Sequence, residues 1–322
     1  LVVMAVSLVI GPTSALNARE GLRWLAFPLA GGSAPDPERL ELARQVLLEV
    51  RLPRVLLALL VGAALSGAGA AMQSAFRNPL VDPYVLGVSS SAAFAAALAM
   101  AAGTRWVAPS AFAGGLGAVA LTHLAARGGP RASVLSLVLA GVVIGGLCTA
   151  GLTLVQFWTD PFRLQTIVHW TMGRLHHAGW PAVRLAAPWI VPALTALLVL
   201  AWRLDTLALG DDEARAAGVD PVRLRAAVLI PAVLAASAAV AAAGVIGFYG
   251  LVVPHAARLV AGADHRRLLP VATLGGGIVL VIVDTLSRTA FSFELPVGVF
   301  TTALGAPIFL WLLRRSRIGW EV

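Results

Sequence analysis

Long apolar stretches separated by short polar connections run along the whole chain. Ten of these stretches approach the roughly 20 apolar residues that a helix needs to cross a bilayer. They cover approximately residues 1–16, 54–76, 83–102, 106–126, 135–157, 182–202, 225–247, 251–262, 270–290 and 300–314. Their Ala, Leu and Gly runs lack the alternation of apolar and polar residues that is typical of a transmembrane barrel. The pattern therefore predicts an all-α polytopic membrane protein with about ten transmembrane helices.

Two polar segments interrupt this pattern. Residues 17–53 contain "PERLELARQVLLEV", whose apolar positions have helical spacing, so we expect an amphipathic helix on the outer surface. Residues 204–225 contain "LALGDDEARAAGVD", where early acids and a later Arg suit the dipole of a short helix. Gly218 would end that helix, and Asp220 followed by Pro221 would begin the next. No linker divides the chain, so residues 1–322 are expected to form a single transmembrane domain.

Two stretches are rich in small residues, which allow transmembrane helices to approach one another closely. They are "GAALSGAGAA" at 62–71 and "AASAAVAAAGVIG" at 235–247, and both are expected in central helices. The segments that contain them, 51–80 and 223–255, begin with Arg and end near a Pro. Six spans before the charged loop would invert the second segment relative to the first. The sequence thus predicts an inverted repeat, which is frequent in transporters.

The composition excludes several classes of function. Hydrophobic residues make up 59% of the chain, and mean hydropathy is +0.86. All 24 basic residues are Arg, and a chain without Lys can build neither a P-loop nor a Schiff base. The net charge of +8 comes from arginines scattered at the ends of apolar segments, which does not indicate a nucleic-acid surface. Cys148 is alone, and no metal-binding or nucleophile motif appears, so we expect no enzyme activity and no metal in this chain.

Several long motifs, in a fixed order, carry a family resemblance. They are "RLPR" at 51–54, "RNPLVDPYVLGVSS" at 77–90, the charged loop, "GVIGFYGLVVPHAARLVAGADHRRLLP" at 244–270, "DTLSRTAF" at 284–291 and "ELPVGVFTTALGAPIFLWLL" at 294–313. Over nearly the whole chain they resemble the permease subunit of the bacterial ABC importers for vitamin B12, iron-siderophores and haem. The resemblance implies a ten-helix subunit of the inner membrane that works as a homodimer. Two cytoplasmic subunits would bind ATP and Mg, and a periplasmic substrate-binding protein would deliver substrate to the dimer interface.

The resemblance also assigns roles to three groups of residues. An ATPase-coupling loop would comprise Leu209, Gly210, Asp211, Asp212, Glu213, Arg215, Gly218, Val219 and Arg223. The binding protein would dock, through its acidic residues, on Arg51, Arg54 and Arg288. A cytoplasmic gate would comprise Asn78, Pro79, Leu80, Val134 and Leu135, although the family often has small hydroxyl residues where Val134 and Leu135 stand. Each group also has a simpler interpretation from its residues alone. The charged loop could be a solvated connection, the three arginines could reach the lipid headgroups, and the segment around Asn78 could be a plain turn.

The substrate pathway is expected around "HWTMGRLHHAGW" at 169–180, near the outer mouth. This sequence has Arg174, His176 and His177 where the family usually has Gly or Ser and then apolar or small residues. A His could ligate haem iron and an Arg could pair with a propionate, although adjacent helical histidines point about 100° apart. An interfacial polar rim explains the same residues. Met172 and Gln73 are further candidates, and the substrates rank as haem, then ferric siderophore, then cobalamin.

A different class of protein, an ion-coupled secondary transporter, would need carboxylates within its spans. Asp82, Asp264 and Asp284 all fall near span ends, and Asp284 is expected to pair with Arg288 four residues later. His265 is expected in a cytoplasmic turn, either solvated or near the ATP-binding subunit.

Overall fold

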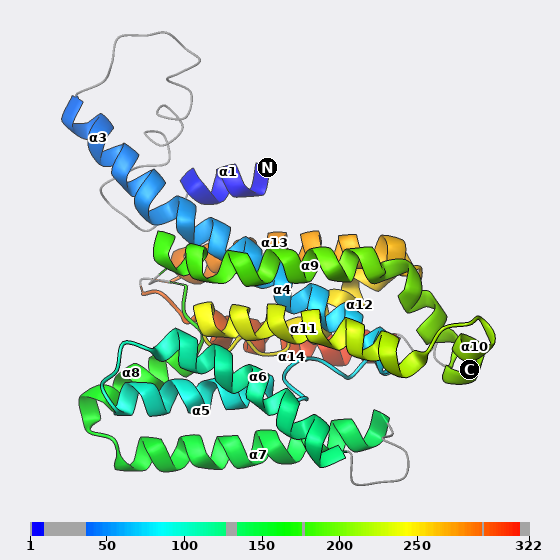
Figure 1. Cartoon of the computed structure of the whole chain (residues 1–322). Coiled ribbons are helices and arrows are strands. Elements are labelled where there is room, and N and C mark those ends of the chain that lie inside the picture. The colour runs from blue at the N-terminus through cyan, green and yellow to red at the C-terminus, as the bar shows by residue number, and fades with distance from the viewer. Residues whose placement is uncertain (1, 10–36, 127–133, 176–177, 292, 316–322) are drawn as a thin grey trace.

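The computed structural model describes residues 2–9, 37–126, 134–175, 178–291 and 293–315, and every regular element among them is a helix (Figure 1). The helices are α1 (Val2–Val9), α3 (Pro37–Gln45), η1 (Val46–Arg51), α4 (Leu52–Ala75), α5 (Val88–Ala101), α6 (Val107–Ala126), α7 (Val134–Trp158), α8 (Pro161–Thr171), α9 (Trp180–Leu209), α10 (Asp211–Ala216), α11 (Pro221–Ala243), α12 (Tyr249–Ala261), α13 (His265–Thr289) and α14 (Val297–Arg315). The all-helical class predicted from the apolar pattern is confirmed.

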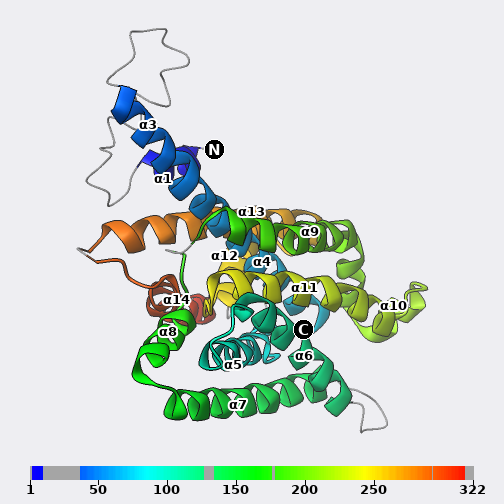
Figure 2. The ribbon, with the colours of Figure 1, turned by 60° about the vertical axis from the view of Figure 1, so that its left-hand side comes forward.

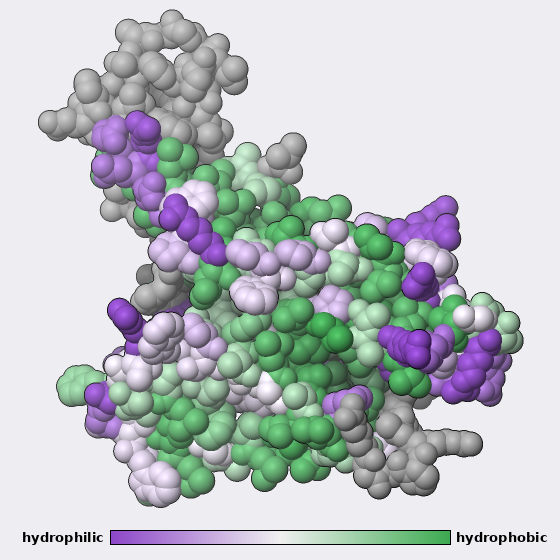
Figure 3. All heavy atoms as spheres, in the orientation of Figure 1, coloured by the Kyte–Doolittle hydropathy of each residue, from purple (hydrophilic) through white to green (hydrophobic). Residues whose placement is uncertain are grey.

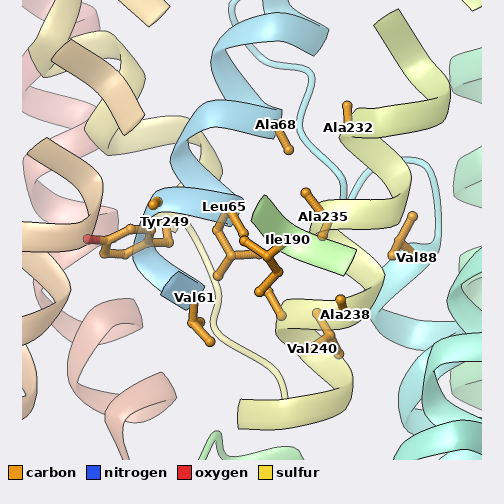
Figure 4. Packing of buried hydrophobic residues seen from close by; sticks show 14 of the residues in the cluster. Val61, Leu65, Ala68, Val88, Ile190, Ala232, Ala235, Ala238, Val240 and Tyr249 are labelled. Carbon is orange, nitrogen blue, oxygen red and sulfur yellow. The ribbon is translucent and has the colours of Figure 1, made fainter. Parts of the chain in front are cut away.

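Helix α4 forms the centre of the molecule and packs against α9, α11, α12 and α13. Its small residues bring backbones together, because a Cβ at Gly62 would overlap the Gly276 carbonyl and one at Gly69 would overlap that of Gly250. Figure 4 shows Leu65 of α4 beside Ile190 of α9, with small residues of α11 lining the other side. The predicted central position of both small-residue stretches is therefore confirmed.

Helices α5, α6, α7 and α8 form a second layer beside this core (Figure 2). Helix α7 is the outermost and exposes many large apolar side chains. The visible surface is apolar over the middle of the molecule, and hydrophilic residues gather at its two ends (Figure 3). One end carries α3 and α8 and is called the α8 end below, and the opposite end carries α10 and is called the α10 end.

Six of the described helices are long and apolar enough to cross a membrane, so the chain is a multi-pass membrane protein. They are 41–75, which includes α4, and α6, α7, α9, α11 and α13. Residues 88–101 and 297–312 form shorter apolar helices. Of the predicted first span, residues 10–16 lie outside the described residues.

The structure differs from the sequence prediction at two helix boundaries and by one additional helix. The predicted amphipathic helix is present, but it runs through η1 into α4, where the Leu52 N–H bonds to the Leu47 carbonyl five residues back. This π-helical turn lets the chain pass Pro53, which cannot donate the usual bond. Helix α9 continues to Leu209, so the charged connection is shorter than predicted. Helix α8 was not predicted, although Asp160 caps it by accepting a bond from the Arg163 N–H.

Candidate functional site

A cavity of about 580 Å³ lies where several interruptions of the helical pattern meet. Its walls come from the α4–α5 connection, the end of α8, the α11–α12 connection and the first turns of α14. The lining is mostly apolar, its polar side chains being Asp82, Tyr84, Thr171 and Thr302. Non-helical backbone at membrane depth is tolerated where it lines a cavity, and such breaks mark substrate sites in transporters. Tyr84, Met172 and Val299 of the lining are exposed, so the arrangement provides a chamber that opens on one face of a membrane-spanning bundle.

The α4–α5 connection, residues 76–87, reaches this chamber by turning back along α4. Asp82 packs beside Gly250 of α12, and Gly250 in turn lies against the Leu65 carbonyl. Leu65 stands ten residues, or about 15 Å of helix, before the end of α4. The Asp82 side chain is buried, and its Oδ1 accepts a bond from the Val85 N–H at 3.0 Å. Asp82 is thus buried in the chamber wall, which its position near a predicted span end did not indicate.

The α8–α9 connection brings two predicted pathway residues near the chamber. Met172 lines the cavity directly. The Arg174 N–H bonds to the Ala243 carbonyl at 2.6 Å, which ties the connection to the end of α11. Burial lowers the pKa of the half-buried Arg174 guanidinium, and no carboxylate within the described residues pairs with it. His176 and His177 lie outside the described residues.

Gln73, also predicted for the substrate pathway, lies inside the helix bundle. Its side chain is buried, and its Nε2 donates to the Gly250 carbonyl at 3.2 Å. Its Oε1 has no hydrogen-bond partner among the residues that the structure describes. In this conformation Gln73 joins α4 to α12, and its role in the pathway remains a prediction.

The predicted gate residues occupy the α10 end of α4 and the start of α7. Asn78 Oδ1 accepts a bond from the Leu80 N–H at 2.9 Å, which forms a tight turn around Pro79. Leu80 is 49% exposed and Leu135 is 65% exposed. Val134 begins α7, and its side chain lies outside the described residues. Because both leucines lie on the surface, a constriction built from them needs a second surface to close against.

The charged loop has the local structure that its sequence predicts. Helix α10 has acids in its first turn, and Arg215 pairs with Asp212 at 2.8 Å. Gly218 follows in a left-handed conformation, and Asp220 caps α11 by accepting bonds from the N–H groups of Val222 and Arg223. Several members of the predicted coupling loop project into solvent, among them Leu209, Asp212, Glu213, Arg215 and Arg223. A water-soluble partner can reach this surface, and the coupling role itself stays a prediction.

Arg225 lies at the end of the predicted charged loop, but its contacts were not predicted. Arg225 of α11 donates from Nη2 to Asp211 Oδ1 at 2.8 Å and from Nε to the Ala75 carbonyl at 2.9 Å. The guanidinium therefore bonds the first residue of α10 and the last residue of α4. The pattern of charges places Arg225 close to the charged loop, but its bond to α4 depends on contacts between distant segments.

The expectation that His265 is solvated is wrong. His265 is 2% exposed, its Nδ1 lies 2.5 Å from Asp205 Oδ1, and its Nε2 bonds to the Ser74 hydroxyl. Ser74 is buried as well, so this hydrogen bond lies inside the protein. The His265 backbone N–H also bonds to Asp205, so α9 holds the start of α13 by two bonds.

At the α8 end, Arg54 forms an ion-pair cluster with two acids. Its guanidinium lies 2.9 Å from Asp284 and 3.3 Å from Glu294. The predicted pair between Asp284 and Arg288 is present at 3.6 Å, so Arg54 is the closer partner of Asp284. Asp284 and the Arg54 guanidinium are largely buried, whereas Glu294 is exposed.

The other two predicted docking arginines hold the end of α1. Arg51 donates to the Leu8 carbonyl at 2.8 Å, and Arg288 donates to the Ser7 carbonyl at 2.7 Å. Cations at the last carbonyls of a helix stabilise it through its dipole. Both side chains are buried in this conformation, and their docking role stays a prediction.

Comparison with known proteins places this geometry in a family. The FecCD transport family matches residues 1–315. A probable iron chelatin transport system permease protein from Helicobacter pylori strain 26695 is 43% identical over 84% of this chain and 83% of its own length. The hemin transport system permease protein HmuU of Yersinia pestis is 42% identical over 84% and 83% of the two chains.

A solved structure agrees with these matches. It is the inward-facing conformation of a metal-chelate type ABC transporter, with a TM-score of 0.85 and 32% identity over 98% of this chain and 97% of the other. The resemblance inferred from the motifs is therefore confirmed. This chain belongs to the FecCD transport family, the ABC importer permeases that its sequence resembles.

Proposed function

We propose that this chain is the membrane-spanning subunit of an ATP-driven importer of a metal chelate in the bacterial inner membrane. The observation that carries the proposal is the chamber of about 580 Å³ formed by interrupted helices within a family of transport permeases. The shorter helices α1, α5, α12 and α14 would complete ten spans together with the six long ones. The connections after α4 and α11 both enter the chamber wall, which supports an inverted repeat of the two halves.

The complex would contain a second copy of this chain, two cytoplasmic ATP-binding subunits and a periplasmic substrate-binding protein. Helix α7 is the surface that we propose for the second copy, because a row of exposed apolar residues follows one side of it, and this row suits contact with lipid as well as with another helix: Leu135, Leu139, Val142, Val143 and Leu147. The exposed charged loop around α10 supports contact with the ATP-binding subunits. Binding of ATP would close these subunits, and the coupling loop would transmit that movement so that the pathway opens to one side of the membrane at a time.

Haem is the substrate that we propose first. Arg174 is a half-buried cation near the chamber without a carboxylate partner in the described part of the chain, and a two-fold axis would present it twice. A dicarboxylate such as haem could pair with both copies. An anionic ferric siderophore would be attracted by the same pair, and the two relatives, named for iron chelatin and hemin, are almost equally similar to this chain.

Uptake by proteoliposomes tests the proposal. The chain is reconstituted with its ATP-binding subunits and binding protein, and haemin, a ferric siderophore and cobalamin are supplied in turn. We expect uptake that requires ATP, with haemin preferred, and Arg174→Ala should lower haemin uptake. Uptake by the chain alone down a proton or sodium gradient would instead establish the ion-coupled class, for which the buried Asp82 is the candidate carboxylate. Unchanged haemin uptake by Arg174→Ala would remove the reason for ranking haem first.

A further inference from the structure

Two side chains connect the region of the charged loop to the end of α4. Arg225 is the first, since its guanidinium bonds Asp211 of α10 and the Ala75 carbonyl of α4 at the same time. Its side chain is 11% exposed, and that of Asp211 is 34% exposed, so the pair is shielded from solvent on the α4 side. The planar guanidinium suits this position because its separate N–H groups can reach two partners in fixed directions.

His265 is the second connection, and it ends on the neighbouring residue of α4. Its Nδ1 contacts Asp205 in the last turns of α9, and its Nε2 bonds to Ser74. Asp205 precedes α10 by six residues, and Ser74 precedes Ala75. Two independent chains of hydrogen bonds therefore run from the α9–α10 segment to consecutive residues at the end of α4.

The end of α4 holds the connection that carries the proposed gate. The Arg77 N–H bonds to the Ser74 carbonyl at 3.1 Å, and the Asn78 N–H bonds to the Gln73 carbonyl at 2.9 Å. Arg77 has a φ of 48°, a backbone conformation that residues other than Gly rarely adopt, so the surrounding contacts hold this turn in one conformation. A displacement of Ser74 and Ala75 would consequently be passed to Asn78 and the residues that follow it.

We propose that Arg225 is a positioning residue that links the coupling loop to the cytoplasmic gate, so that a movement of α10 shifts the 76–87 connection, while His265 holds α9 and α13 to the same end of α4. The proposal rests on the proposed function, because it assumes that the ATP-binding subunits act on α10. Replacement of a residue that only stabilises the structure would lower the number of working complexes, and transport and ATP hydrolysis would fall together. A residue that transmits movement would lower transport more than it lowers ATP hydrolysis, and the two roles can be separated by that ratio.

The experiment measures ATP hydrolysed per molecule of substrate taken up by the full reconstituted complex. The probe is whichever of haemin, ferric siderophore and cobalamin the wild-type complex transports. We expect Arg225→Gln to raise the ratio roughly tenfold, within the usual range of coupling between sites. Asp211→Ala removes the acceptor at the exposed end of the same link and should also raise the ratio, and it serves if Arg225→Gln does not assemble. Arg225→Lys should remain uncoupled, because a single ammonium cannot reproduce the two-ended fork.

Arg267→Gln is the matched control, since Arg267 lies at the same end with a side chain that is 80% exposed and pairs only locally with Asp264. Its ratio should equal that of the wild type. An unchanged ratio in Arg225→Gln or Asp211→Ala, with the wild type transporting normally, would overturn the link while the proposed function stands. Full coupling in Arg225→Lys would overturn the two-ended role of the guanidinium. A wild-type complex that transports none of the three probes with ATP would overturn the proposed function and this inference together.

Discussion

Replacement of Asp284 by Ala probes the ion-pair cluster at the α8 end. The carboxylate is 1% exposed and lies 2.9 Å from Arg54 and 3.6 Å from Arg288, so its removal leaves two largely buried guanidinium groups without their shared partner. Breaking a buried ion pair by removing one side typically costs about 3–5 kcal/mol, because the remaining charge stays desolvated. Glu294 still faces Arg54 at 3.3 Å, which reduces the penalty, and we therefore expect a loss of about 3 kcal/mol in the free energy of unfolding.

The assay is reversible unfolding in mixed micelles by titration with SDS, followed by the fluorescence of the nine Trp residues. Glu294→Gln is the control, because this acid binds the same Arg54 but is 36% exposed, and exposed pairs contribute at most about 1 kcal/mol. The reasoning would be refuted if Asp284→Ala destabilised the protein no more than Glu294→Gln does. That result would mean that water reaches the arginines in solution and that the cluster is not a buried one.

Two further predictions follow from the packing and the outer surface. Gly69→Ala should destabilise the fold by about 1–3 kcal/mol, because its Cβ would overlap the Gly250 carbonyl. The control Gly275→Ala should be neutral or stabilising, because the space around its Cβ is open. Equal free energies of unfolding in SDS for the two variants would contradict this prediction. Arg51→Glu combined with Arg54→Glu should weaken docking of the binding protein in a pull-down with the assembled complex, and unaltered docking would exclude these arginines from the interface.

The helices and the local structure of the charged loop follow from information that is local in the sequence. Apolar runs of sufficient length predict the membrane-crossing helices, and Gly218 with Asp220 predicts the break between α10 and α11. The continuity of α3 with α4 was not predicted, because Pro53 suggests a boundary and only the π-helical turn removes it.

The burial of Asp82 and of His265 depends on contacts between segments that are distant in the sequence. Asp82 enters the interior because two glycines, Gly69 and Gly250, allow α4 and α12 to touch, and nothing in the neighbourhood of Asp82 encodes that contact. His265 follows a polar turn, which is typical of an exposed residue, yet its partners come from α4 and α9. The sequence thus predicts the parts of the candidate site that lie within one continuous motif. It does not predict the parts that form only when separate helices pack together.

The glycine contacts of α4 also determine which parts of the molecule can move against one another. At Gly62 with Gly276 and at Gly69 with Gly250, the backbones of neighbouring helices lie so close that a Cβ at these glycines would overlap a carbonyl. We therefore expect helices α4, α12 and α13 to move together during transport, with the hinges in the breaks between helices and at the boundary with the α5–α8 layer.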